Sequence, residues 1–403
     1  MNRQKPSERT YDVVLFGATG FVGELTAEYL LTHAPQGCRW ALAGRGTAKL
    51  ERLRERLAVL DPDRAAKVDV VRADAGDRAA MRALAESARV VASTVGPYLW
   101  YGEELVAACA EAGTDYTDLT GEAEFVDLMW MRYDERARRS GARIVHACGF
   151  DALPHDLSVY FNVQQLPEGV PLTVDGFVRS SGRISGGTLV TSLAILARQR
   201  QARAAARERR RYEPAPAGRR VRAPLGAPRF SRETGTWALP LPTIDPQVVR
   251  RSAASLDRYG PDFRYRHYAS VKTLPVALAG PVGVGALAAA AQVPAVRSWL
   301  SARYEPGRGP GPEVRERAWF QVRAVGEGGG RRAFTEVSGG DPGYGETAKM
   351  LAEASLCLAL DELPETAGQV TAAAAMGDAL IERLRGAGIG FRVCHVGDAR
   401  PRG

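Results

Sequence analysis

The first 150 residues alternate between short runs of mostly apolar residues and longer stretches in which apolar residues recur every three or four positions. The short runs predict strands at 13–16, 40–43, 68–72, 90–93, 115–118 and 143–148. The longer stretches predict helices at 23–33, 49–60, 77–85, 102–112 and 124–140. Strands that alternate with helices at this spacing are typical of an α/β fold built on a Rossmann-type, doubly wound parallel sheet.

The pattern changes after about residue 150. A strand is expected at 174–180, a helix at 187–200, and an antiparallel hairpin from 319–324 and 332–338 around the tip 326–330. Helices are expected at 345–360 and 373–385. We therefore expect a Rossmann domain over 1–150, a second α+β domain that binds substrate over 151–340, and C-terminal helices over 341–403 that pack back on the first domain.

The net charge of +8 is concentrated in one stretch of the chain. Ten arginines and two glutamates lie between positions 198 and 222, so the rest of the chain is close to neutral. We interpret 198–228, which is rich in arginine and proline, as a solvated helix end and loop. Such a stretch can also bind nucleic acid or an anionic membrane surface. A nucleic-acid-binding protein is not expected.

A second stretch, 274–296, contains no charged residue and is long enough to span a bilayer. It carries three prolines, three glycines and many alanines, so it is only mildly hydrophobic. This stretch could be a membrane span, an interfacial element, or a buried or loosely packed segment, and all three alternatives stay open. Together with the basic stretch, it leaves a peripheral membrane contact open.

The cysteines and the N-terminal residues indicate the cellular compartment in which the protein is expected. Five cysteines are scattered along the chain without a C-x-x-C pair, which is typical of reduced thiols. No apolar signal core precedes the first expected strand. We therefore expect a cytoplasmic protein.

The first strand ends in GATGFVG, and a helix follows. A strand, G-x-x-G-x-x-G and a helix have the form of a dinucleotide-binding turn. The first glycine permits a tight turn, the second lets the backbone approach a pyrophosphate, and the third lets helix and strand pack closely. The phosphates then bind at the helix N-terminus. The cofactor-binding residues expected here are Gly17, Ala18, Thr19, Gly20, Phe21, Val22 and Gly23.

The end of the second strand indicates which dinucleotide binds. An NAD site usually has an acidic residue there, but this strand ends in LAGRG, with Arg45 at its tip. An arginine can form paired hydrogen bonds with a 2′-phosphate, and Lys49 adds a positive charge one turn later. We therefore expect NADPH. Asp74, after the third strand, is expected either to accept from the adenine amino group or to cap the next helix.

The nicotinamide ring is expected beyond the fourth strand, where the chain reads STVGPYLWYG. The residues expected beside the ring are Thr94, Val95, Gly96 and Pro97. Tyr98 is a candidate catalytic residue as a proton donor, or else it is packing. Asp151 and His155, in HACGFDALPHDL, are further candidates for acid–base catalysis, or else they cap the helix that follows Pro154. Asp156 in the same stretch is expected to cap a helix.

Other reaction classes find less support. Tyr268 and Lys272 match the Y-x-x-x-K pattern of short-chain dehydrogenases but lie far beyond the expected dinucleotide domain. The five histidines are dispersed, without an H-x-x-x-H pair or a cluster with cysteine, so no metal site is expected. No G-x-S-x-G nucleophile elbow is present.

Several longer motifs resemble the saccharopine dehydrogenase-like oxidoreductase family, and within it the trans-acting enoyl reductases of glycolipid and polyketide assembly. The resemblance covers nearly the whole chain. Its motifs are GATGFVG, LAGR, VGPY, ACAEAGTDYTDLTGE, GFDALPHDL, SGGTL and GGDPGYGETAKMLAEASLCLA. The chain departs from the family at Ser93 and Thr94, where Asn is common, at His155, where Ser is common, and in VTAAAAMG, which lacks a usual proline.

The resemblance implies NADPH-dependent reduction of the α,β double bond of an acyl thioester, in lipid, polyketide or glycolipid assembly. The substrate would be carried on an acyl carrier domain of a polyketide synthase. Two alternatives stay open. One is an NAD(P)-dependent oxidoreductase acting on another substrate, such as a C–N bond. The other is a non-catalytic nucleotide-binding protein at a membrane or lipid surface.

Overall fold

The computed structural model describes residues 9–181, 195–293 and 310–399. The chain forms two compact units, which we describe separately. Unit 1 comprises Met1–Leu153 and Tyr344–Ala387, and unit 2 comprises Pro154–Gly343 and Gly388–Gly403. The SGGTL motif, most of the helix expected at 187–200 and the end of the uncharged stretch lie outside the described residues.

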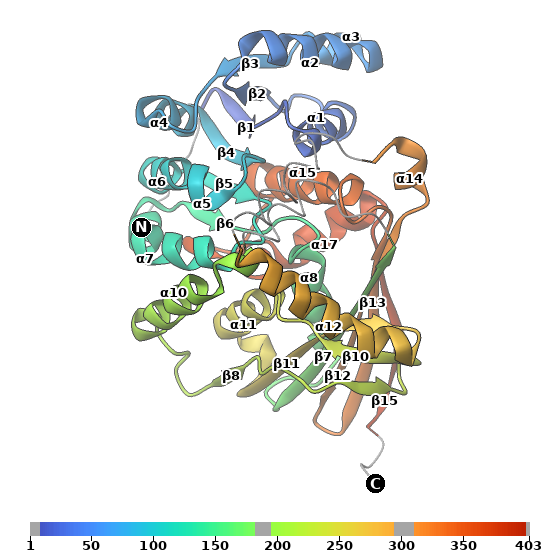
Figure 1. Ribbon diagram of the computed structural model, residues 1–403. Coiled ribbons are helices and arrows are strands. Elements are labelled where there is room, and N and C mark those ends of the chain that lie inside the picture. The colour runs from blue at the N-terminus through green and yellow to red at the C-terminus, as the bar shows by residue number, and fades with distance from the viewer. Residues whose placement is uncertain (1–8, 182–194, 294–309, 400–403) are drawn as a thin grey trace. The chain divides into compact units, whose positions relative to one another are not determined.

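Unit 1 is built on a parallel sheet of seven strands in the order β14-β6-β5-β4-β1-β2-β3 (Figure 1). The strands are β1 (Tyr11–Phe16), β2 (Trp40–Gly44), β3 (Asp69–Arg72), β4 (Ala88–Ser93), β5 (Asp115–Asp118), β6 (Arg143–Val145) and β14 (Gly368–Val370). The inner strand β1 is almost fully buried because helices cover both faces of the sheet. The predicted α/β fold with a Rossmann-type sheet is confirmed.

Helices form a layer on each face of this sheet. On one face α4 (Arg78–Ser87) packs beside α6 (Glu103–Ala112), which packs beside α7 (Ala123–Ser140) (Figure 1). On the other face α1 (Phe21–His33) lies beside α15 (Gly345–Leu360). The other helices that the structure describes in this unit are α2 (Thr47–Leu60), α3 (Pro62–Ala65), α5 (Tyr98–Tyr101), α16 (Ala372–Ala375) and α17 (Gly377–Gly386).

The C-terminal helices return to this sheet, as the sequence predicts. Helix α15 contacts α1, β1, β4 and β5, and the Tyr29 hydroxyl donates to Glu353 Oε1 across the α1–α15 contact (2.7 Å). Thr371 caps α16 by accepting from Ala374 N–H. The helix expected at 373–385 is interrupted at Met376, so it forms the two helices α16 and α17.

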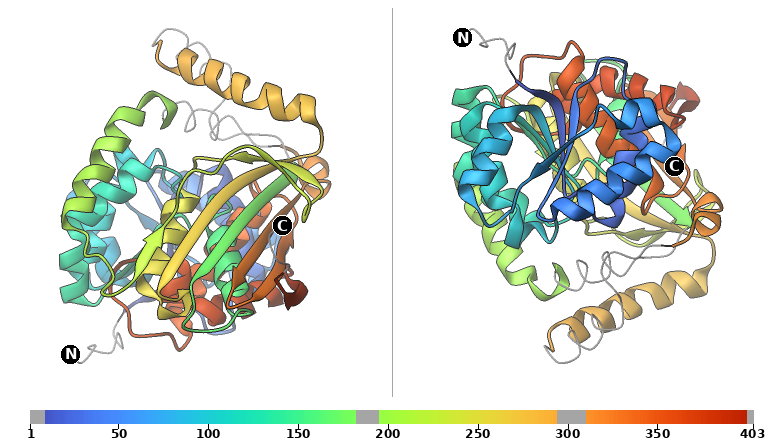
Figure 2. Two further views of the ribbon diagram at one scale, coloured as in Figure 1. Left: turned by 90° about the horizontal axis from the view of Figure 1, so that it is seen from below. Right: turned by 90° about the horizontal axis from the view of Figure 1, so that it is seen from above.

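Unit 2 contains a mixed sheet in the order β15-β13-β12-β7-β11-β10-β9, with β8 also paired to β11. Its strands are β7 (Leu172–Ser181), β8 (Arg220–Arg222), β9 (Arg229–Ser231), β10 (Thr236–Pro240), β11 (Asp262–Val271), β12 (Trp319–Gly328), β13 (Arg331–Gly339) and β15 (Gly390–Asp398). They form the broad curved sheet in the left view of Figure 2. Strands β12 and β13 form the hairpin that the sequence predicts. Strand β15 pairs with β13, although only helices were expected over 341–403.

Two helices share the core of this sheet, α8 (Leu153–Val163) and α11 (Asp245–Ser255). Val159 of α8 and Val249 of α11 are buried in one cluster with Phe263 and Tyr265 of β11. The remaining elements are α10 (Gln199–Tyr212), a 3₁₀ turn (Asp257–Tyr259), α12 (Leu274–Ala291) and α14 (Pro312–Glu316). The basic stretch is thus helical up to Tyr212, and β8 interrupts the loop expected after it.

The uncharged stretch forms α12. Near its start Leu274, Val276 and Leu278 are exposed, whereas Ala277 is buried. Across the described part of the chain, no helix has both the length and the apolar character that a membrane crossing requires.

Candidate functional site: a dinucleotide cradle over a buried polar network

The predicted cofactor residues of unit 1 meet at one edge of the parallel sheet. Phe16 at the end of β1 is in register with Ala43 of β2 and with Ser93 of β4. Gly44 at the end of β2 is in register with Arg72 of β3. The loops that follow β1, β2, β3 and β4 therefore start side by side, at the edge where doubly wound sheets bind their ligands.

At two positions of the glycine turn, the surrounding protein atoms leave no room for any residue other than glycine. Gly17 has φ of +88°, and a Cβ there would lie 2.6 Å from Thr94 Oγ1. A Cβ on Gly23 would lie 2.3 Å from the Gly17 carbonyl oxygen, which is backbone and cannot swing aside. Only glycine fits these two positions, so the sequence-based explanation for both is consistent with the structure.

Gly20 differs, because the protein itself leaves room for a side chain there. A Cβ on Gly20 would meet only the Gly17 carbonyl oxygen, at 3.4 Å. The residue is exposed and precedes the first turn of α1, and no side chain caps this helix. An uncapped helix N-terminus with bare backbone suits a diphosphate, since its N–H groups and the helix dipole favour an anion.

The tip of β2 offers positive charge without a competing acid. Arg45 and Lys49 are both exposed, and no acidic residue of the described chain pairs with either. Asp74 accepts from Gly76 N–H at 3.0 Å, whereas Asp77 caps α4. The alternative of Asp74 as the helix cap is therefore wrong. Contact of Asp74 with an adenine stays a prediction.

We expect Arg45→Asp to raise the dissociation constant of NADPH by about 10- to 100-fold. The change removes charge-assisted hydrogen bonds worth about 1.5–3 kcal/mol and places a like charge beside the 2′-phosphate. NADH lacks that phosphate, so its affinity should change little. Fluorescence titration of both cofactors measures this, with Arg52→Asp on the exposed face of α2 as the control of equal charge. An unchanged NADPH affinity would contradict the assignment.

The segment after β4 is tied to the glycine turn. Thr94 donates its hydroxyl hydrogen to the Gly17 carbonyl oxygen at 3.0 Å, and Val95 lies against Gly17. Gly96 and Pro97 follow and lead into α5. The predicted residues Thr94, Val95, Gly96 and Pro97 thus border the same turn as the predicted pyrophosphate site. Their contact with a nicotinamide ring stays a prediction.

Tyr98 is buried in the interior of unit 1. Its hydroxyl donates to the Ser93 carbonyl oxygen (3.0 Å) and accepts from Leu119 N–H (3.2 Å). Burial, together with the nearby Asp118, raises the pKa of Tyr98 well above its ordinary value. The neutral phenol therefore links the ends of β4 and β5. Proton donation to a substrate would require breaking the bond to Ser93, so this geometry supports packing rather than the catalytic alternative.

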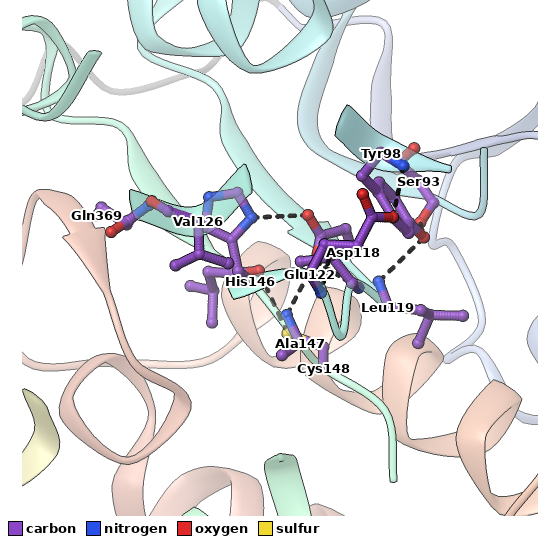
Figure 3. A network of polar contacts seen from close by, with 12 residues as sticks. Ser93, Tyr98, Asp118, Leu119, Glu122, Val126, His146, Ala147, Cys148 and Gln369 are labelled. Carbon is purple, nitrogen blue, oxygen red and sulfur yellow. Dashed lines mark hydrogen bonds and ion pairs between the residues drawn. The ribbon is translucent and has the colours of Figure 1, made fainter. Parts of the chain in front are cut away.

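Tyr98 is part of a buried polar network that could not be predicted from the sequence (Figure 3). Asp118, which is fully buried, accepts from Ala147 N–H (2.8 Å) and Thr120 N–H (3.1 Å) through one carboxylate oxygen. The other oxygen lies 2.7 Å from His146 Nδ1. Ala147 has φ of +60°, a left-handed conformation that this residue type rarely adopts. The Asp118 carboxylate thus holds two loops of the sheet edge together.

Glu122 completes the network at the start of α5. Its two carboxylate oxygens accept from the N–H groups of Tyr98 (2.8 Å) and Leu99 (3.0 Å). Burial raises the pKa of Glu122, although the two backbone bonds act against this. The TDLTGE and HACG motifs carry these residues, but their spacing alone did not show that Asp118 and His146 meet.

The remaining candidates are not brought together within one unit. Asp151 belongs to unit 1, where it is exposed and lies near Gly121. His155 belongs to unit 2, where it is buried and its Nδ1 lies 2.7 Å from Asp245 Oδ1. Asp156, expected as a helix cap, is buried and accepts from the Ser252 hydroxyl. Catalytic roles for Asp151 and His155 stay predictions.

The chain is similar to known proteins over nearly all its length. Residues 13–145 match the family model of the saccharopine dehydrogenase NADP binding domain. A trans-acting enoyl reductase of Mycobacterium bovis (strain BCG / Pasteur 1173P2) is 38% identical, covering 95% of this chain and 98% of that protein. A trans-acting enoyl reductase of Mycobacterium ulcerans (strain Agy99) is 34% identical, covering 95% and 97%.

A solved structure shares the fold. Saccharopine dehydrogenase (L-Glu forming) from Saccharomyces cerevisiae superimposes with a TM-score of 0.56 at 11% identity, covering 95% of this chain and 99% of that one. The family match confirms NADP(H) as the cofactor, in agreement with the Arg45 argument. The protein is an NAD(P)H-dependent oxidoreductase. The chain belongs to the saccharopine dehydrogenase-like oxidoreductase family, in its trans-acting enoyl reductase branch.

Proposed function

We propose that the protein reduces the α,β double bond of an acyl thioester with NADPH, as a trans-acting enoyl reductase in lipid, polyketide or glycolipid assembly. The observation that carries this proposal is the similarity to relatives named trans-acting enoyl reductases over 95% of the chain. The cradle of unit 1 supports it, because the exposed Arg45 suits the phosphate that distinguishes NADPH from NADH.

The residues of the chain bind and orient the reactants in this proposal. The turn from Gly17 to Gly23 and the start of α1 hold the diphosphate, and Arg45 with Lys49 binds the 2′-phosphate. When bound, NADPH supplies the hydride. The net reaction would add this hydride at the β-carbon and a proton at the α-carbon of the enoyl thioester.

The network around Asp118 positions the loops on which this chemistry depends. Glu122 fixes the start of α5, directly after the segment predicted to border the nicotinamide. Thr94 fixes that segment to the glycine turn. A reacting geometry must be held closely, since small displacements cost large factors in rate. Asp118, Glu122 and Tyr98 therefore act as positioning residues.

The direct assay follows NADPH consumption by the full chain with a trans-2-enoyl thioester of pantetheine or of a carrier protein. The expected product is two hydrogens heavier than the substrate, and NADPH is strongly preferred to NADH. Tight NADPH binding without product from several enoyl thioesters would contradict the proposal and favour another substrate, such as one with a C–N bond.

A groove on unit 2 supports an acidic carrier protein as the partner. Three exposed arginines on one face of α10, Arg203, Arg207 and Arg210, line a groove of about 340 Å³ with Gln247 of α11. No acidic residue of the described chain pairs with these three arginines, whereas Arg209 and Arg211 pair with Glu213 and Glu208. Unpaired guanidinium groups suit carboxylates and the phosphate of a phosphopantetheine arm.

We expect the double variant Arg203→Glu/Arg207→Glu to raise the KM for a carrier-bound enoyl substrate by about tenfold or more. Reversing these charges weakens the encounter with an acidic partner. The kcat/KM for the pantetheine thioester should not change, because that substrate lacks the carrier. Arg54→Glu/Arg82→Glu on unit 1 is the control of equal charge. Equal effects on both substrates, or on both variants, would contradict carrier docking at this groove.

A further inference from the structure

Three residues that are distant in sequence meet in the interior of unit 2. His155 lies on α8, Asp245 begins α11, and His267 lies in β11. Their exposed fractions are 3%, 2% and 3%. One nitrogen or oxygen atom from each lies within 4.8 Å of the others. The dinucleotide cradle of unit 1 uses none of these residues.

Two contacts join Asp245 to the histidines of this cluster. His155 Nδ1 lies 2.7 Å from Asp245 Oδ1, and His267 Nε2 lies 3.8 Å from Asp245 Oδ2. Yet Asp245 Oδ1 and His267 Nε2 lack a hydrogen bond of regular geometry, although both atoms are buried. Buried polar atoms are normally satisfied by a protein group, a water molecule or a metal ion.

The surrounding residues orient the cluster as the outer partners of metal ligands do. The Tyr265 hydroxyl lies 2.7 Å from His267 Nδ1, and Thr243 donates to Asp245 Oδ2. With Nδ1–H donating to Tyr265, the lone pair of the imidazole lies on Nε2, which faces Asp245. Outer partners of this kind fix the tautomer and the ring orientation of metal-binding histidines.

We propose that His155, Asp245 and His267 bind one divalent transition-metal ion, with Zn²⁺ as the best match and a water molecule as the fourth ligand. Two imidazoles and one carboxylate suit Zn²⁺, whereas Mg²⁺ and Ca²⁺ prefer oxygen ligands. Tetrahedral bonds of about 2.0–2.1 Å place neighbouring ligand atoms roughly 3.3 Å apart. One ligand atom from each of the three residues lies within 4.8 Å of the others, so side-chain shifts bring the three atoms to this spacing.

The ion would link α8, α11 and β11 and so stabilise unit 2. The full chain, purified without a histidine tag, should contain about one equivalent of zinc by elemental analysis. Removing zinc with a chelator should lower Tm by about 5–10 °C, and adding one equivalent back should restore it. Co²⁺ in the stripped protein should give the visible bands of a near-tetrahedral N/O site, without a thiolate charge-transfer band.

A matched pair of variants tests the assignment to these residues. His267→Gln should lose the zinc and the Co²⁺ bands, whereas His395→Gln, at an exposed position of β15, should keep both. If His267→Gln does not fold, the Co²⁺ titration of the unaltered chain remains decisive. A stripped chain that keeps the same Tm and takes up no Co²⁺ at micromolar concentration would overturn the proposal.

Discussion

Replacing Gly23 with alanine is expected to abolish measurable NADPH binding and to lower the thermal stability of the protein. The new Cβ would lie 2.3 Å from the Gly17 carbonyl oxygen and 2.9 Å from two backbone carbons of Ala18. Backbone atoms cannot move aside alone, so α1 must shift away from the turn. Overpacking of this kind costs about 1–3 kcal/mol. The shift also withdraws the helix N-terminus from the phosphates, and we expect at least about a 100-fold loss of affinity.

Gly20→Ala separates the effect on the cofactor from the effect on the fold. Its Cβ meets one protein atom at 3.4 Å, so Tm should stay close to that of the unaltered protein. The added methyl group occupies the surface that the diphosphate must approach, so NADPH affinity should still fall. Calorimetric NADPH titration and thermal unfolding of both variants measure this difference. Unaltered NADPH affinity in Gly23→Ala would show that the cofactor does not use this turn.

Asp118→Ala is expected to lower the free energy of unfolding by about 3–5 kcal/mol. The change leaves the N–H groups of Thr120 and Ala147 and the His146 imidazole without their shared acceptor in a buried site. It also releases the left-handed conformation of Ala147, which the carboxylate helps to hold. Because these loops border the cofactor residues, reductase activity should fall with stability.

Asp118→Asn is the matched control. Its amide oxygen can accept from both N–H groups, and its NH₂ group can donate to His146 Nδ1 in the appropriate tautomer. We therefore expect a loss of only about 1 kcal/mol. Denaturant unfolding followed by circular dichroism compares the three proteins. Equal losses in the two variants, or a loss below about 1 kcal/mol for Asp118→Ala, would mean that this network is not a major source of stability.

The fold of unit 1 could be predicted because its signals are local. Buried strands, helices of ordinary length and a glycine turn each occupy a few consecutive residues, and the parallel sheet follows from their alternation. The spacing of Gly17, Gly20 and Gly23 likewise indicates a function by itself. Strand β14 was missed because it has only three residues, and its pairing with β6 is visible only in the folded chain.

The orientation of single side chains could not be predicted in the same way. A tyrosine after a strand can face the ligand or the interior, and Tyr98 faces the interior because Ser93 and Leu119 satisfy its hydroxyl there. Asp118 ends β5, and His146 directly follows β6. Only the parallel pairing of these two strands brings the two side chains together.

The dispersed histidines show the limit of spacing rules. Metal motifs read from sequence rely on ligands one turn apart or in one loop, and His155 and His267 are separated by more than a hundred residues. The packing of α8 and α11 against β11 makes them neighbours. A cluster assembled by tertiary structure leaves no pattern in a single sequence.

The most direct test of the central claim is the transfer of label from deuterated NADPH. The full chain is incubated with a trans-2-enoyl thioester of a carrier protein and either (4R)- or (4S)-deuterated NADPH. Mass spectrometry and NMR then show which carbon of the product carries the deuterium. The account predicts one deuterium at the β-carbon with one of the two cofactors and an α-proton from water. Deuterium at another carbon, or saturated product that never contains the label, would contradict hydride transfer to an enoyl thioester.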